Sequence, residues 1–281
     1  GMSDMTTYEF TAPLAARNVM VVNISPGPRA PQAPDSRLVL CDVAEFLDGL
    51  VEEIGERREP PRTAWDEALA EARESWGLRL LASLESRGSL PPAGRVIKEL
   101  ARRLPDDTIV SVGAGMHLLY PMAFMSCNHP LSYLSTVNFG AMGFGLAASM
   151  AASLVHPERA VVAVLGDGDF MMTVQDLETA VREGLSIKVL VLNDFQYRVL
   201  NVRQKLQFAG HVLGTEHGNP DFAELARCFG AAGYRLDSAE RIDEVLDAVV
   251  AEKGPVVVDV IIDPEDLPPM NVEANLRMSA L

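Results

Sequence analysis

The chain has 281 residues and a formal net charge of −15, and 48% of its residues are hydrophobic while only 6% are aromatic. This composition predicts one sizeable core plus an appended unit, and the negative charge argues against nucleic acid or an anionic membrane as a partner. No apolar run approaches the ~18 residues that a membrane-spanning helix needs, and three cysteines without metal-ligand spacing favour reduced thiols and a cytoplasmic protein.

The first 90 residues predict a few separate elements. These are a strand at 18–24, a Pro-rich turn that ends at Pro34, a strand at 38–40, an amphipathic helix at 43–54 and a second helix from 65 to about 84.

From residue 91 to about 263, helices and strands alternate along the chain. The expected helices are 94–104, 143–155, about 173–184, 221–229 and 239–252, and the expected strands are 108–112, 131–136, 160–165, 187–192 and 255–262. This alternation predicts an α/β fold with a doubly wound, mostly parallel sheet. We expect domain boundaries that divide the chain into residues 1–90, 91–265 and 266–281.

Two short motifs follow neighbouring strands of this predicted sheet. Gly166-Asp167-Gly168 ends one buried apolar run, and Asn193-Asp194 ends the next. Strands joined by a helical crossover lie parallel, so Asp167 and Asp194 should emerge at the same sheet edge, where open α/β sheets bind ligands. Carboxylate oxygens suit Mg²⁺, and Gly168 would let a diphosphate approach the backbone near helix N–H groups. Alternatively, these are ordinary turn residues, since Asp and Gly both favour turns.

The spacing of these motifs resembles a known family. Asp167 and Asp194 are 27 positions apart, and Gly-Asp-Gly followed at this distance by Asn-Asn or Asn-Asp resembles the diphosphate-binding domain of thiamine diphosphate enzymes of the acetolactate synthase, pyruvate oxidase and pyruvate decarboxylase group. The resemblance implies thiamine diphosphate and Mg²⁺ as cofactors. It also implies three metal ligands: Asp167, the side chain of Asp194 and the backbone carbonyl of Gln196. The commoner residue at 194 is Asn, and Asp keeps the oxygen ligand while adding a negative charge.

Two further segments carry the resemblance. In the Gly-rich stretch 139–146, Met142 would wedge between the two rings of the cofactor and the Gly140 carbonyl would accept a hydrogen bond from its aminopyrimidine; alternatively Met142 fills the core. The stretch 112–117 resembles the family's first diphosphate loop. The implied cofactor-binding residues are Gly113, Ala114, Gly115, Gly140, Met142, Gly166, Asp167, Gly168 and Asp169.

The first diphosphate loop departs from the family, which usually has polar side chains there. This chain has Ala114, Gly115 and Met116, so backbone N–H groups would do most of the binding. His117 is a candidate contact, although a lone histidine is more often structural.

Other motif interpretations fit less well. Asp167-x-Asp169 with Glu178 at the twelfth position resembles a calcium loop, but methionines occupy two positions that need an oxygen ligand and a glycine. Gly113-x-Gly115 suggests a dinucleotide site, but the third glycine of that motif is replaced by Leu118.

The first 90 residues resemble the final third of the family's central domain and its linker helix. A pyrimidine-binding domain, which in this family supplies a catalytic glutamate, has no counterpart in this chain, and the acids at Glu52, Glu53 and Glu56 fit a solvated helix face. We assign no certain catalytic residue to the chain. We expect a second polypeptide to supply that domain, with the cofactor at the interface of a homo- or hetero-oligomer. FAD is not expected, because most of the central domain that carries it in some relatives is missing.

The segment after Asp194 would face the substrate. Tyr197, Leu200 and Arg203 lie there, and position 200 aligns with a catalytic acid of simple decarboxylases, which leucine cannot replace. Arg203 could grip a carboxylate, or Arg198 and Arg203 are surface cations on a helix. The sequence thus predicts a subunit of a split thiamine diphosphate- and Mg²⁺-dependent 2-oxo acid decarboxylase or carboligase, a lyase or transferase similar to acetolactate synthase. The alternative is a non-catalytic scaffold or regulatory paralogue that keeps the fold.

Overall fold

The computed structural model describes residues 18–24, 35–55, 63–86, 88–136 and 139–269. Contacts along the chain divide it into two compact units, at residues 1–73 and 74–280. The Pro-rich turn predicted before residue 35 and most of the predicted C-terminal tail lie outside the described residues. The domain boundaries expected at 90/91 and 265/266 stay predictions.

The first unit contains a two-stranded parallel sheet and an amphipathic helix. Strand β1 (Asn18–Asn23) pairs with β2 (Asp35–Leu40), and helix α1 (Val43–Ile54) follows at once. Asp42 caps this helix, since its carboxylate accepts a hydrogen bond of 2.7 Å from the Ala44 N–H. None of the residues of α1 is buried. Helix α2 (Thr63–Ala82) begins in this unit and ends in the second.

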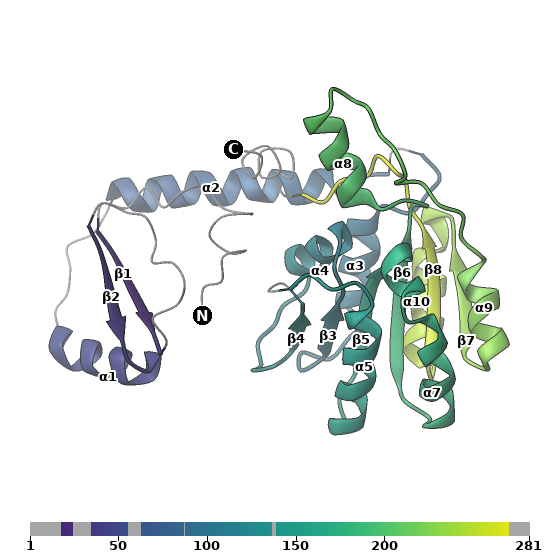
Figure 1. Cartoon of the computed structure of the whole chain (residues 1–281), viewed down its shortest axis with the longest axis horizontal. Coiled ribbons are helices and arrows are strands. Elements are labelled where there is room, and N and C mark those ends of the chain that lie inside the picture. Colours follow the sequence, from purple (N-terminus) through teal and green to yellow (C-terminus); the bar gives the residue numbers. More distant parts are fainter. Residues whose placement is uncertain (1–17, 25–34, 56–62, 87, 137–138, 270–281) are drawn as a thin grey trace. The chain divides into compact units, whose positions relative to one another are not determined.

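The second unit is built on a six-stranded sheet in which every pairing is parallel. Its strand order is β4-β3-β5-β6-β8-β7 (Figure 1). The strands are β3 (Ile109–Val112), β4 (Tyr133–Ser135), β5 (Val161–Gly166), β6 (Ile187–Asn193), β7 (Ala232–Leu236) and β8 (Val256–Ile261). The predicted α/β class and doubly wound parallel sheet are therefore confirmed.

Helices cover both faces of this sheet, so its central strands are apolar on both sides. Val162 and Val164 of β5 join the core on one face, while Val161 and Leu165 join the core on the other. The helices that pack on the first face are α3 (Ala93–Ala101), α4 (Leu119–Phe124) and α10 (Ile242–Ala251). Those on the second are α5 (Phe144–Val155), α6 (Asp167–Met171), α7 (Leu177–Arg182) and α9 (Phe222–Phe229).

Helix α8 (Arg198–Gln207) lies beyond the carboxyl ends of the strands, in the connection that leaves β6 (Figure 1). Three short 3₁₀ turns complete the described elements: η2 (Met116–Leu118), η3 (Val174–Asp176) and η4 (Ala239–Arg241). Among the residues described, no helix is both long enough and apolar enough to cross a membrane.

The strand order places a topological switch point between β3 and β5. The chain leaves β3 for its outer neighbour β4 and then returns to β5 on the other side of β3. The loops after β3 and β5 therefore part in opposite directions and leave a crevice between them, where doubly wound proteins bind ligands. Gly113 directly follows β3 and Gly166 is the last residue of β5, and both belong to the predicted site.

Several details differ from the sequence-based expectation, and helices α4 and α8 were not among the helices expected in this unit. A helix was expected to begin near Thr173, but α6 begins at Asp167, so Gly-Asp-Gly lies at a helix start rather than in an open loop. Acidic side chains in a first helical turn are favoured by the helix dipole, which compensates for the two glycines. Strand β7 was not predicted, because it is a partly exposed edge strand without β-branched residues.

Candidate functional site

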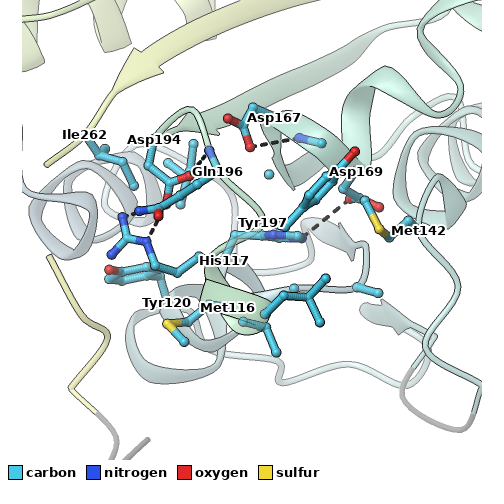
Figure 2. A pocket seen from close by; sticks show the side chains of 18 of the residues that line it. Met116, His117, Tyr120, Met142, Asp167, Asp169, Asp194, Gln196, Tyr197 and Ile262 are labelled. Carbon is cyan, nitrogen blue, oxygen red and sulfur yellow. Dashed lines mark hydrogen bonds and ion pairs between the residues drawn. The ribbon is translucent and has the colours of Figure 1, made fainter. Parts of the chain in front are cut away.

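A cavity of about 270 Å³ opens at the carboxyl end of the sheet, beside the switch point (Figure 2). This volume lies near the lower end of small-molecule sites. The predicted site residues that line it are Ala114, Gly115, Gly140, Met142, Gly166, Asp167, Gly168, Asp169, Asp194, Gln196, Tyr197 and Leu200. Two predicted residues, Gly113 and Arg203, are not among its lining residues.

Asp167 stands at the first position of α6, directly after β5, and is only 2% exposed. Its Oδ1 accepts a hydrogen bond of 2.8 Å from the Gly168 N–H, and its Oδ2 accepts one of 2.8 Å from the Asn219 side chain. The same Asn219 amide donates to Asn193 at 2.9 Å. These donors fix the carboxylate in the crevice.

Asp194 follows β6, the strand that pairs with β5, and is buried. Its Oδ2 is bound by two nitrogens of Arg198, Nε at 2.6 Å and Nη2 at 2.5 Å. The Gln196 N–H donates to Oδ1 at 3.2 Å. Burial raises the pKa of Asp194 to about 6; Arg198 opposes this shift, and the charge of Asp167 adds to it. The two carboxylates therefore interact across the crevice.

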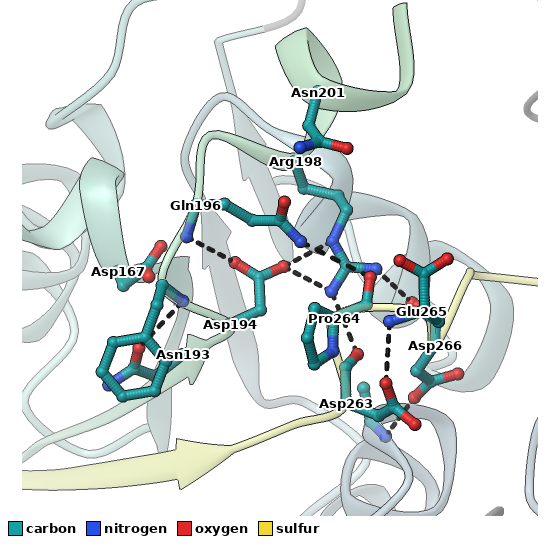
Figure 3. Close-up of polar contacts among 12 residues, drawn as sticks. Asp167, Asn193, Asp194, Gln196, Arg198, Asn201, Asp263, Pro264, Glu265 and Asp266 are labelled. Carbon is teal, nitrogen blue, oxygen red and sulfur yellow. Dashed lines mark hydrogen bonds and ion pairs between the residues drawn. The ribbon is translucent and has the colours of Figure 1, made fainter. Parts of the chain in front are cut away.

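Arg198 is itself buried, and it also donates to the backbone carbonyls of Asp263 and Asp266, at 3.0 and 2.8 Å. Figure 3 shows its guanidinium between Asp194 and the segment that follows β8. The suggestion that Arg198 is a surface cation is therefore wrong. Arg198 therefore supplies the counter-charge of Asp194 in this arrangement.

Tyr197 lies directly over Gly168. A Cβ at Gly168 would overlap the Tyr197 ring and would lie 3.4 Å from the Met142 methyl group. The ring also packs against His217, with centroids 4.6 Å apart. Gly168 thus permits a close approach to the backbone, as expected, but the group that makes this approach is Tyr197. A ligand that binds against Gly168 has to displace this ring.

His117 and Asp169 form a second buried feature of the cavity. His117 Nε2 and Asp169 Oδ2 lie 3.5 Å apart, and the side chains are 7% and 1% exposed (Figure 2). The other oxygen of Asp169 accepts a hydrogen bond of 2.7 Å from the Gly143 N–H.

The oxygen donors of the cavity fit a hard divalent cation. Asp167 and Asp194 supply two carboxylates at one sheet edge, and Mg²⁺ typically takes one or two carboxylates and completes its shell with carbonyls, water and phosphate oxygens. In the described part of the chain, no group of three or more His, Cys, Asp or Glu side chains converges as a complete metal site. An all-protein cage, as used by zinc, is therefore not formed by those residues, whereas a partial shell suited to Mg²⁺ is.

Some residues of the site carried no signal in the sequence. Asn219 lies far along the chain from Asp167, so local patterns did not indicate their contact. Tyr120, Ile262 and Asp266 also line the cavity. The last two follow β8, whose carboxyl end lies beside that of β6, and this pairing was not predicted from the sequence.

The fold and the site define an α/β ligand-binding domain with two carboxylates and a glycine-lined cavity at its switch point. Residues 113–260 match the family model described as thiamine pyrophosphate enzyme, C-terminal TPP binding domain. The match covers more than half of the chain, and the chain therefore belongs to this family, as the sequence motifs predicted.

The chain is also similar to acetolactate synthases. It is 28% identical over 228 residues to the mitochondrial acetolactate synthase catalytic subunit of Aspergillus candidus, covering 80% of this chain and 33% of that protein. It is 33% identical over 183 residues to the corresponding Saccharomyces cerevisiae subunit, with coverages of 64% and 26%. For the Escherichia coli isozyme 2 large subunit, the identity is 30% over 200 residues, with coverages of 71% and 36%. The chain thus spans about a third of the length of the curated relatives it matches.

Proposed function

We propose that this chain is the diphosphate-binding subunit of a split thiamine diphosphate- and Mg²⁺-dependent enzyme that acts on a 2-oxo acid. The observation that carries the proposal is the approach of two buried carboxylates, Asp167 and Asp194, at the carboxyl ends of adjacent parallel strands. A protein that served only as a scaffold would have no physical need to hold two like charges together in a crevice, because their mutual repulsion costs stability.

The residues of the cavity would divide the binding between them. Asp167, Asp194 and the Gln196 carbonyl would bind Mg²⁺, and the backbone of Gly115 and Gly168 would hold the diphosphate. Bound thiamine diphosphate supplies an electron sink for breaking a bond next to a carbonyl. Met142, whose methyl group reaches the space above Gly168, would support the cofactor rings, and Gly140 would offer its carbonyl to the aminopyrimidine.

A partner polypeptide would complete the site. The chain matches 26–36% of the length of the three relatives. Helix α1 supports an assembled state, since its apolar side chains Val43, Leu47, Leu50, Val51 and Ile54 are 40–70% exposed. We propose that the partner carries the pyrimidine-binding domain and its glutamate, in a cytoplasmic homo- or hetero-oligomer; two of the relatives are named as mitochondrial.

The substrate proposal rests on the names of the relatives and on the segment after β6. All three relatives are named acetolactate synthases, which favours decarboxylation followed by carboligation over simple aldehyde release. Leu200 is half exposed at the cavity and offers no proton, which agrees with this outcome. Tyr197 and Arg203 stay candidates for substrate contact, although Arg203 would first have to turn towards the cavity.

A non-catalytic role is the second candidate, and one observation favours it. Tyr197 lies over Gly168 and Arg198 donates to Asp194, so both contacts would have to open before a diphosphate bound against Gly168 and a metal bound to Asp194. A paralogue without catalytic activity would keep Tyr197 over Gly168 and Arg198 on Asp194 permanently.

Titration calorimetry separates the two candidates. We expect the purified chain to bind thiamine diphosphate only with Mg²⁺, and EDTA or Asp194→Ala to abolish the heat of binding. Asp237→Ala, which removes a half-exposed carboxylate outside the cavity, is the control and should bind as the wild type does. Absence of binding by the wild type at millimolar thiamine diphosphate and Mg²⁺ would contradict a diphosphate site that works in this chain alone. The same titration with a candidate chain that carries a pyrimidine domain would then separate a site that needs its partner from the non-catalytic role.

A further inference from the structure

Helix α1, which follows strand β2 (Figure 1), presents a stripe of exposed apolar side chains. They are those of Val43, Leu47, Leu50 and Ile54, which are 40–56% exposed, and Val51 beside them is 70% exposed. The four lie at successive spacings of four, three and four positions, which is the heptad spacing of helices that pack against another helix. None of the residues of α1 is buried. The described part of the chain therefore leaves a helix-packing surface uncovered.

The sheet beside α1 also has exposed apolar side chains, on both of its faces. Val21 lies opposite Leu38 in the parallel register, so Leu38 and Leu40 face one side of the sheet and Met20 faces the other. These three residues are exposed. Parallel sheets normally have more than two strands and are covered on both faces. The exposed stripe of α1 thus belongs to a unit that lacks cover, which is what a docking site for another protein requires.

The polar side of α1 is acidic. It carries Glu45, Asp48, Glu52 and Glu53, and the helix contains no lysine or arginine. By the geometry of an α-helix, Asp48 and Glu53 lie on the two flanks of the apolar stripe. A helix that packs on the stripe would therefore meet a carboxylate at each edge of the contact. Lysine or arginine at the corresponding positions of that helix would make the contact favourable and would set its specificity.

The same charges argue against a second copy of this chain as the partner on this surface. Two α1 helices packed stripe to stripe would bring together eight carboxylates, four from each copy, without a basic side chain from either helix. Each copy would also carry a net charge of −15. A net charge this far from zero favours the monomer, and like charges across a contact suppress a wrong partner. The charge pattern therefore favours a different protein with basic residues.

We infer that α1 is the docking site for an amphipathic helix of a different protein, whose apolar face is edged by lysine or arginine. The apolar stripe supplies the buried contact, and the acids on its flanks select a basic partner over a second copy of this chain. The inference rests on the proposed function only in assigning this helix to the partner polypeptide. None of the residues of α1 lines the cavity, so this contact concerns assembly and not the chemistry of the site.

Two synthetic peptides that differ only in charge provide the test. Both have leucine at the two apolar positions of each heptad; the remaining positions are lysine in one peptide and glutamate in the other. Fluorescence anisotropy of each labelled peptide is measured during titration with the full chain. We expect the lysine peptide to bind, with an affinity that falls as NaCl is added, and the glutamate peptide not to bind. Leu47→Asp/Val51→Asp should weaken the lysine peptide by about 10-fold or more, because it places charges in the apolar contact.

Reversal of the flanking charges tests the choice of partner. Asp48→Lys/Glu53→Lys should reverse the preference, so that the glutamate peptide binds more tightly than the lysine peptide. Glu67→Lys/Glu71→Lys is the matched control, since it makes the same change of charge at two exposed residues of helix α2. This control should keep the preference for the lysine peptide. Circular dichroism shows whether each variant folds, and Leu47→Ser/Val51→Ser replaces the aspartate variant if that one does not.

Several results would overturn the inference. If the lysine peptide binds Leu47→Asp/Val51→Asp as well as the wild type, its binding is only the general attraction of a cation to an acidic chain. Equal affinities for the two peptides, or no binding of either, would show that α1 does not select a basic helix.

Sedimentation velocity tests the second copy directly. A wild-type dimer that Leu47→Asp/Val51→Asp dissociates would assign the stripe to self-association and overturn the inference, whereas a wild-type monomer agrees with it. These measurements do not involve thiamine diphosphate. The calorimetric test of the proposed function can therefore fail while α1 still selects the lysine peptide, and α1 can fail to select it while the cofactor binds.

Discussion

Arg198 holds Asp194 through two nitrogens, at 2.6 and 2.5 Å, and both side chains are more than nine-tenths buried. A buried charge that loses its partner lowers the stability of the fold. Removing either side chain of this pair should therefore destabilise the chain. The same Asp194 is the proposed second ligand for Mg²⁺. Metal binding and the contact with Arg198 therefore compete for one carboxylate.

Replacing this arginine should destabilise the chain. We expect Arg198→Met to lower the free energy of unfolding by about 3 kcal/mol, because Asp194 is left buried without its counter-charge. Lys205→Met in the same helix is the control, since its ion pair with Glu265 is exposed and should contribute less than about 1 kcal/mol. Urea denaturation of both variants measures the difference.

The same variant should respond more strongly to ligand. Without Arg198 a bound metal would replace the lost counter-charge of Asp194, so Mg²⁺ with thiamine diphosphate should raise the melting temperature of Arg198→Met more than that of the wild type. Equal shifts in the two proteins would mean that Arg198 and the metal do not compete.

Substitution of Gly168 should act through Tyr197. The added Cβ of Gly168→Ala would overlap the Tyr197 ring, and overpacking of this kind costs about 1–3 kcal/mol. Gly218→Ala is the control, because nothing lies within 4 Å of that Cβ position. If the overlap is the cause, Tyr197→Ala should restore most of the lost stability in the double variant, which a double-mutant cycle of unfolding free energies would show. Additive effects would place the strain elsewhere.

The fold was predictable because its signals are local. Val161–Gly166 and Ile187–Asn193 are nearly uninterrupted apolar runs, and a helical crossover between two such strands makes them parallel. The meeting of Asp167 and Asp194 at one edge of the sheet followed from this. The positions of residues at strand ends can therefore be predicted from the hydrophobic pattern alone.

The contacts of those residues were not predictable. Arg198 reaches Asp194 because the chain turns sharply at Phe195, whose φ of +61° is unusual for a side chain of that size. Asn193-Asp194 favours a turn here, but the sequence does not indicate the positive φ of Phe195. Asn219 reaches Asp167 from a distant loop, and Tyr197 covers Gly168 only once α8 has been placed. Such contacts depend on tertiary packing, which residue spacing does not encode.

The exposure of the apolar face of α1 can be tested on the isolated chain, without a partner protein. Leu47 and Val51 are 50% and 70% exposed, so their replacement removes little buried area. We expect Leu47→Asp/Val51→Asp to change the unfolding free energy by less than about 0.5 kcal/mol. It should nevertheless lower binding of an apolar dye such as anilinonaphthalene sulfonate, which reports exposed apolar surface. Glu52→Ser, on the polar side of the same helix, is the control. A large loss of stability would show that this face is already covered within the chain.

The buried side chain of Lys188 should make the stability of the chain depend on pH in the alkaline range. Its side chain is 7% exposed and donates to the Glu252 carbonyl at 2.6 Å, and burial lowers its pKa below the ordinary 10.5 in spite of the opposing charge of Glu252. Between the folded pKa and 10.5, the unfolded chain binds more protons at this site than the folded chain. The contribution of Lys188 to stability therefore rises as the pH increases through this window.

Lys188→Met removes this contribution while keeping a side chain of similar length. The stability of the variant relative to the wild type should be greatest at about pH 7.5 and should shrink towards about pH 10.5, as the wild type loses its buried charge. Urea midpoints across this range measure the change. Lys253→Met, which removes an exposed lysine next to Glu252, is the control. Its urea midpoint should change with pH as that of the wild type does, so it accounts for the tyrosines that titrate at high pH. A constant difference between Lys188→Met and the wild type would mean that Lys188 keeps its ordinary pKa in the folded chain.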